Sequence, residues 1–182
     1  MEISSKQILN VLRVLAWILF LGLSVEAGAI IVSAVLRFIV NPDQVDKLWQ
    51  EVNLTALFNF DRGHFVAQII LISIVAVMKA LMFYLIVKIF YNKKLNLAQP
   101  FSIELQHFIL IMALLSFGIG LFAGWATKYS RWLSGKGVAM PDIQLQTVGG
   151  ADVWIFMSVV LYVLSQIFKR GIEIQSENEL TV

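Results

Sequence analysis

Four long apolar runs constrain the fold of this chain more than any other feature of its sequence. They cover residues 14–36, 65–90, 108–127 and 153–168, and the fourth is the shortest. A helix needs about 20 apolar residues to cross the hydrocarbon core of a bilayer. With 59% hydrophobic and only 14% charged residues, the chain has too little polar surface to solvate a globule of its 182 residues. We therefore expect one domain, an all-α four-helix transmembrane bundle in the lipid bilayer.

Basic residues beside the four spans predict the orientation of the chain. Those of the N-terminal segment, the short second connection and the C-terminal tail lie directly against the membrane. Those of the two long connections are spread among acidic residues. We therefore expect both termini in the cytosol and two extracytoplasmic loops. No small-residue cleavage site closes the first span, so we expect it to stay as an anchor.

The two outer loops carry signals for short elements. Asn41 and Pro42 are typical of a helix start, and the apolar residues after them fall on one face, which predicts a short interfacial helix (Val45, Leu48, Trp49 and Val52). In the second loop, apolar and polar residues alternate between a proline and a glycine pair, as in a short strand (Ile143, Leu145 and Thr147). A single strand needs a partner, for which the other outer loop is the candidate.

Two opposite charges lie inside the apolar runs, although a lysine at the centre of a span costs about 2.5–3.5 kcal/mol. Glu26 lies near the middle of the first span and Lys79 near the middle of the second. Consecutive antiparallel helices bring such residues to similar depth, so we expect an ion pair. The favoured interpretation is a structural pair that fixes the contact between the two helices. The alternative is a pair that lines a polar cavity for an ion, a proton or a small ligand.

Small residues at a four-residue spacing predict close contacts between helices. Gly120 and Gly124 have this spacing in the third span, and Ser24 and Gly28 repeat it beside Glu26. Packing within the bundle is the favoured interpretation of both pairs. A homodimer formed through the third span is the alternative.

Motifs for catalysis or for binding a metal or cofactor do not stand out in the sequence. It has no cysteine, no His-Glu-x-x-His motif, no Gly-x-Ser-x-Gly motif and no carboxylate pair within one span. His64 and His107 lie at the entries of two spans, and Asp61 and Arg62 are typical of a helix cap and an interfacial cation. The net charge of +2, without a basic stripe, gives no basis for nucleic-acid binding. We therefore expect a protein that is not an enzyme and holds no cofactor.

Two stretches of the sequence carry a resemblance to a known family. "QPFSIE", residues 99–104, enters the third span and contains Pro100, Phe101, Ser102 and Glu104. "FKRGIEIQSENELTV", residues 168–182, leaves the fourth span and ends in Glu177, Asn178, Glu179, Leu180, Thr181 and Val182. Together they resemble the domain-of-unknown-function family 2975 of small bacterial membrane proteins. The resemblance implies a four-span protein of the bacterial inner membrane, often found beside a small helix-turn-helix regulator, and no established activity.

Physical chemistry gives both stretches a structural role. Pro100 stops the second connection from running into the third span as a helix, Ser102 caps the new helix, and Glu104 meets its positive end. The tail, residues 171–182, is acidic and carries scattered apolar residues. We expect it either to fold back on Lys93 and Lys94 or to hold a cytosolic protein partner.

The sequence thus favours a non-enzymatic regulatory or sensing partner in the membrane. A small transporter or channel component that uses Glu26 and Lys79 is the second interpretation, and a membrane enzyme is the third. A transporter needs a polar path from the charged pair to both faces of the membrane. A sensor needs a sealed bundle and a binding surface on its loops or tail.

Overall fold

The computed structural model describes residues 5–39, 54–91, 101–142 and 148–179. These residues form five helices: α1 (Ser5–Ile39), α3 (Thr55–Phe60), α4 (Arg62–Tyr91), α5 (Ile103–Gly135) and α6 (Ala151–Glu179). Within the same residues, four helices are long and apolar enough to cross a membrane, namely all except α3. The expected all-α fold of four long helices is confirmed, and it is of the multi-pass membrane type.

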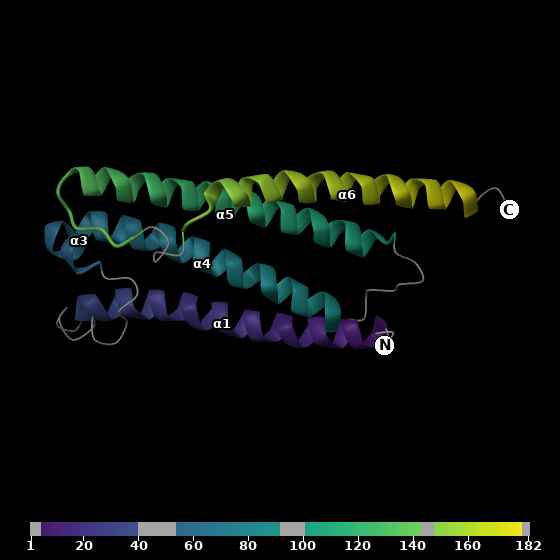
Figure 1. Ribbon diagram of the computed structural model, residues 1–182, viewed down its shortest axis with the longest axis horizontal. Helices are drawn as coiled ribbons and strands as arrows, with labels where there is room; N and C mark the ends of the chain where they lie inside the picture. The colour runs from purple at the N-terminus through teal and green to yellow at the C-terminus, as the bar shows by residue number, and fades with distance from the viewer. Residues whose placement is uncertain (1–4, 40–53, 92–100, 143–147, 180–182) are drawn as a thin grey trace.

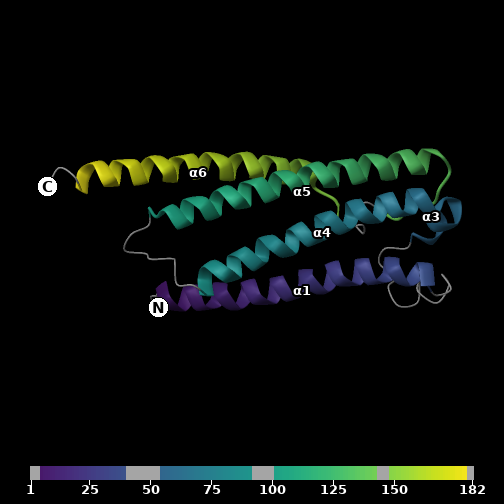
Figure 2. The same ribbon diagram turned by 180° about the vertical axis from the view of Figure 1, so that it is seen from behind.

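The four long helices lie side by side in chain order. α1 packs against α4, α4 against α5, and α5 against α6. Figure 1 and Figure 2 show this row from its two sides. α1 begins and α6 ends at the same end of the molecule, which we call the terminal end, and α3 lies at the opposite end, the loop end. Short connections make each long helix antiparallel to the next. Because the number of long helices is even, α1 begins and α6 ends at the same end.

Small side chains on α1 allow it to approach α4 closely. Ala16, Ala27, Ile30 and Ala34 are buried and recur at helical spacing along α1. Lipid tails are as apolar as leucine, so membrane helices associate by close packing rather than by hiding apolar surface from water. The other sides of α1 expose valine, leucine, isoleucine and tryptophan side chains, which is the surface expected to contact acyl chains.

A sharp corner at Asp61 joins α3 to α4 at the loop end. The backbone N–H of Asp61 closes α3, while its carboxylate accepts a hydrogen bond from the His64 N–H at 2.8 Å. Asp61 therefore ends one helix and caps the next, as a capping aspartate does. Leu57 and Phe58 of α3 are buried, and the Phe58 ring meets Phe65 edge-on at 5.1 Å. α3 itself was not predicted from the sequence.

Gly137 ends α5 in a left-handed turn. Its φ is 85°, and its N–H donates to the Ser134 carbonyl at 3.0 Å. The N–H of Val138 donates to the Leu133 carbonyl at 3.3 Å, and both of these side chains are buried. This pair of bonds with its apolar contact is the Schellman motif, which needs a residue that tolerates positive φ.

All four long helices run further than their predicted spans, and α5 and α6 do so most at their C-terminal ends. α5 continues beyond residue 127 to Gly135, so the first part of the expected second outer loop is helical. With 33 residues, α5 is about 50 Å long, against about 30 Å for the hydrocarbon core. α6 continues beyond residue 168 to Glu179. The expected interfacial helix after Asn41 and the expected strand around Leu145 lie outside the described residues.

Candidate functional site

Lys79 lies on α4, an inner helix of the row, and contacts an aromatic ring of α6. It is half-buried on α4, and its ammonium nitrogen lies 5.8 Å from the ring centroid of Trp154 on α6. It is also within electrostatic range of Glu26 on α1. A cation above an indole ring is attracted by the negative face of the ring. α1, which carries Glu26, packs against α4, which carries Lys79, and the ion pair between the two residues stays a prediction.

The motif that precedes the third span starts α5 in the way the sequence predicts. Ser102 is the N-cap, its hydroxyl accepts a hydrogen bond from the Leu105 N–H at 3.3 Å, and Glu104 lies in the first turn. The Ser102 carbonyl also accepts a hydrogen bond from the Gln106 N–H at 3.0 Å. The carboxylate of Glu104, in the first turn, is thus close to the positive end of the helix dipole of α5.

Phe101 of this motif packs against the start of the C-terminal tail. Its ring lies 5.4 Å from the ring of Phe168, and a Cβ atom added to Gly171 would come within 2.5 Å of the Phe101 ring. Only glycine therefore fits at position 171 without moving Phe101. The two stretches that carry the family resemblance contact each other here, which sequence reasoning missed. The sequence signal for this contact was Gly171, because glycine is unfavourable inside a helix and no turn motif surrounds it.

A buried hydrogen bond joins α5 to α6 just inside this aromatic contact. The Gln106 side-chain amide donates to the Ser165 hydroxyl at 3.1 Å, and both residues are buried. Hydrogen bonds of this kind between membrane helices contribute on average about 0.6 kcal/mol. The sequence signal was a polar residue near the same end of each of the two spans.

The C-terminal tail continues the axis of α6 instead of turning back from it. Figure 1 shows α6 extending past the ends of the other helices at the terminal end. Arg170 and Glu173 form an ion pair at 2.9 Å on its surface, and Ile174 is 47% exposed. Lys93, Lys94 and residues 180–182 lie outside the described residues, so the expected contact between the tail and the two lysines stays a prediction.

The two small-residue pairs behave differently. A Cβ atom on Gly120 would lie 2.7 Å from the Ile155 side chain, whereas one on Gly124 would lie 3.8 Å from Ala151. Gly120 therefore packs α5 against the first turns of α6, which occupies the face considered for a homodimer. Gly28 is exposed, and no described atom lies within 4 Å of its Cβ position. The expected packing at Ser24 and Gly28 is therefore wrong at Gly28, because α1 meets α4 through the adjacent face that carries Ala27.

An aromatic cluster surrounds His64 at the loop end. The His64 Nδ1 and the Tyr129 hydroxyl are hydrogen-bonded at 2.6 Å, and the His64 ring lies 5.5 Å from Trp132 and 6.3 Å from Phe60. The partners of His64 on α5 were not predicted. Their signal was an aromatic spacing of three and four residues, which places Trp125, Tyr129 and Trp132 on one side of a helix.

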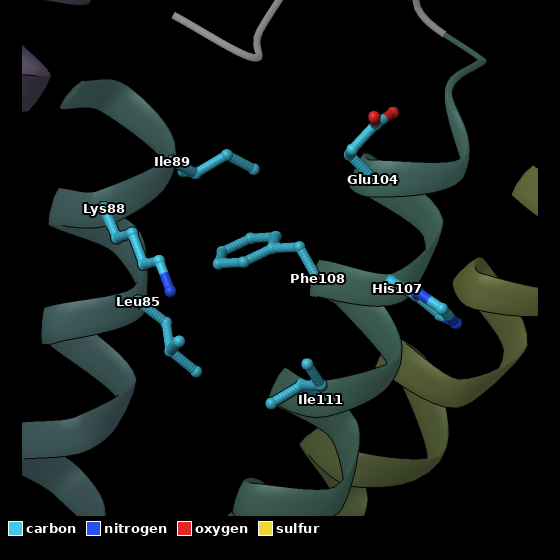
Figure 3. A pocket seen from close by; sticks show the side chains of 7 residues that line it. All are labelled: Leu85, Lys88, Ile89, Glu104, His107, Phe108 and Ile111. Carbon is cyan, nitrogen blue, oxygen red and sulfur yellow. The ribbon is translucent and has the colours of Figure 1, made fainter. Parts of the chain in front are cut away.

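A small groove of about 260 Å³ lies between α4 and α5 near the terminal end. Its lining combines apolar residues with three titratable ones, Lys88, Glu104 and His107. Figure 3 shows the Phe108 ring pointing across the groove toward α4, while the Glu104 carboxylate points out of its end and the His107 ring is turned away from Lys88. The three titratable groups do not converge on one point, so this arrangement does not position an acid and a base for a shared substrate.

Metal-binding groups do not gather in the part of the chain that the structure describes: no three His, Asp or Glu side chains there lie close enough to hold an ion. No family model, curated protein or solved structure matches the chain. Its site must therefore be interpreted from its own geometry.

Proposed function

We propose that the protein is a non-enzymatic regulatory or sensing partner in the bacterial cytoplasmic membrane, with both termini in the cytosol. The proposal includes membership of the family that the two motif stretches resemble. The helical extension of α6 beyond Gly171 supports it most directly. This extension is the surface offered to a cytosolic protein.

The extension is difficult to explain by the stability of the fold alone. An isolated helix of this length gains little in water, because most helical stability in proteins comes from packing an apolar face. Gly171 packs against Phe101, just before α5, and beyond it Ile174 and Glu177 are exposed on one side of the helix. A cytosolic protein that covers this side would supply further packing.

The Phe101 contact gives the proposal a mechanism. Phe101 touches both Phe168, near the end of the span, and Gly171, at the start of the extension. A change in how α5 and α6 pack inside the membrane would therefore move Phe101 and change the direction of the extension. A ligand or force that acts on the bundle would in this way change the position of the α6 extension to which the partner binds.

Site-specific photo-crosslinking in native membranes tests the proposal. A photoreactive residue replaces Ile174 in the extension, and the matched control replaces Ile167, which lies two turns earlier on the same face of α6 and is also exposed. We expect a discrete protein adduct from position 174 and none from position 167, since the latter faces lipid. Adducts at both positions, or at neither, would contradict the proposal.

Deletion of residues 172–182 separates a binding role from a bracing role. If the extension serves a partner, membrane insertion and thermal stability in detergent stay nearly unchanged. If it braces the second connection, the deletion lowers stability and replacing Lys93 and Lys94 with glutamate does the same, although added salt weakens an exposed contact of this kind.

A transporter or channel component is the second candidate, because Glu26 and Lys79 lie near the middle of two spans that pack against each other. Charges at that depth often mark ion or proton pathways. Ion flux into proteoliposomes that is lost in the Glu26→Gln variant, with crosslinking at position 174 unchanged, would favour this candidate over the first.

A further inference from the structure

A second and larger groove lies between α4 and α5 at the loop end. Its volume is about 670 Å³, and it is lined by Ala67, Ile70, Leu71, Trp125, Lys128, Tyr129 and Trp132. The lining residues recur at spacings of three and four on each helix, so each helix contributes one continuous face. Its volume is within the range of about 300–1,000 Å³ that is typical of ligand sites.

The aromatic wall of this groove is held in place by its neighbours. The Trp132 ring stacks on Tyr129 with an interplanar angle of 11° and a centroid distance of 5.8 Å. The Tyr129 hydroxyl is hydrogen-bonded to His64 at 2.6 Å, and Trp125 meets Phe122 edge-on at 5.5 Å. A wall fixed in this way loses little conformational entropy when a ligand binds.

The groove has an apolar inner part and a polar outer part. α4 runs away from the loop end and α5 runs toward it, so Leu71 and Trp125 are its deeper residues and Trp132 is at its outer rim. Trp125 and Trp132 are 55% and 48% exposed. Tryptophan and tyrosine are enriched where a membrane protein meets the lipid headgroups. The order of residues therefore matches a phospholipid, with acyl chain inside and headgroup at the rim.

Two lysines supply positive charge at the rim. Lys128 lines the groove, and the ammonium nitrogen of Lys136 lies 5.6 Å from the ring centroid of Trp132. Asp61 also lies at this corner and carries a negative charge; its carboxylate accepts a hydrogen bond from the backbone N–H of His64. A lysine ammonium at this depth attracts an anionic headgroup on either side of the membrane, because the attraction depends on the opposite charges alone.

We propose that this groove binds one phospholipid with a net negative headgroup. An acyl chain lies along Ala67, Ile70 and Leu71, and the phosphate is placed at Lys128. The site selects an anionic lipid over a zwitterionic one through Lys128, the cation that lines the groove, whereas Lys136 lies over the Trp132 ring at the edge of the groove.

Native mass spectrometry of the detergent-solubilised protein tests the selectivity. The protein is equilibrated with equal amounts of phosphatidylglycerol, which is anionic, and phosphatidylethanolamine, which is zwitterionic, and the retained adducts are counted. We expect about five-fold more of the anionic lipid, since one basic residue near an anionic headgroup contributes about 1 kcal/mol. Equal retention of the two lipids by the unaltered protein would overturn the proposal.

Two pairs of variants assign the effect to the groove. Lys128→Gln should abolish the preference for the anionic lipid, while Arg131→Gln, an exposed cation one turn further along α5 and outside the described lining, should preserve it. Ala67→Phe fills the groove and should remove the retained lipid, while Val66→Phe, on an exposed neighbouring position, should not. Selectivity that survives Lys128→Gln, or is lost equally in Arg131→Gln, would contradict the proposal.

A soluble headgroup fragment separates a lipid site from a site for free phosphate. Glycerol phosphate carries the same anionic group without acyl chains. It should leave the retained phosphatidylglycerol in place, because the apolar part of the groove contributes most of the contact. Displacement at millimolar concentration would show a free-anion site and overturn the lipid assignment.

Discussion

Single residues in this protein matter through the space and the backbone conformation around them, and its glycines illustrate both. Gly135 and Gly137 are two positions apart at the end of α5. Gly135 is helical with nothing within 4 Å of its Cβ position, whereas Gly137 has a φ of 85°. The same amino acid is therefore dispensable at one position and required at the other.

Replacing these two glycines with alanine should change stability in opposite directions. Gly137→Ala forces a side chain into the left-handed region and should lower the free energy of unfolding by about 1–2 kcal/mol. Gly135→Ala improves helix propensity and should raise it by about 0.5–1 kcal/mol. Thermal unfolding in detergent, followed by circular dichroism, measures both. A neutral Gly137→Ala variant would mean that the Schellman turn is not formed.

At the scale of elements, α5 is one of the two inner helices of the row, since it packs against α4 on one side and α6 on the other. Its glycines serve these two contacts separately. Gly118 faces the Met78 side chain of α4, and Gly120 faces Ile155 of α6. Close approach on two sides is possible because small residues allow helix backbones to come near each other.

Alanine at Gly120 and at Gly124 should distinguish a tight helix contact from a loose one. The added methyl at Gly120 meets the side chain and, at 3.0 Å, the backbone nitrogen of Ile155. α6 must therefore shift, at a cost of about 1–3 kcal/mol. At Gly124 the added methyl makes an ordinary contact at 3.8 Å, and the variant should be close to neutral. Equal effects on the melting temperature would show that α6 does not sit on Gly120.

A double-mutant cycle tests the coupling between α1 and α4. Glu26→Leu or Lys79→Met alone leaves one charge in a poorly solvating environment, so each should destabilise more than the two together. We expect a coupling energy of about 1 kcal/mol, the size usual for polar contacts in membranes. Chemical denaturation in mixed micelles gives the free energy of unfolding of the unaltered protein, the two single variants and the double variant. Strictly additive losses would rule out the pair.

The spans could be predicted from the sequence because apolar length is a local property, but the helix ends and the contacts could not. Lys128 ends the apolar run of the third span, yet the backbone stays helical until the turn at Gly137. Hydropathy marks where the environment changes, and backbone geometry decides where a helix stops. The contact of Phe101 with Gly171 depends on how α5 and α6 are placed in three dimensions, which no local pattern encodes.

For the whole molecule, the extension of α6 beyond the other helices gives the two ends different surfaces. The loop end is covered by α3 and by the buried residues Val138 and Val148, whereas at the terminal end α6 extends beyond its neighbours (Figure 1). A protein with such ends presents different surfaces to the two sides of a membrane. Its orientation therefore decides which compartment meets the extension.

Topology reporters should place the terminal end in the cytosol. A reporter fused after Val182 should be active as a cytosolic marker, and one inserted near Gly135 should read as external, because the basic residues closest to the membrane flank the terminal end. Alkaline phosphatase and green fluorescent protein fusions give complementary signals. The reverse result at either position would overturn the orientation and with it the cytosolic partner.

The row of helices in chain order also bears on how the protein is made. Each long helix packs against the one that follows it, so most packing between spans joins helices that are consecutive in the chain, and chains rich in local contacts fold fast. Synthesis proceeds from the N-terminus, and α1 and α4 can pair while α5 is still being translated. α6 is made last, so the contact of Phe101 with Gly171 can form only after the earlier helices have been made.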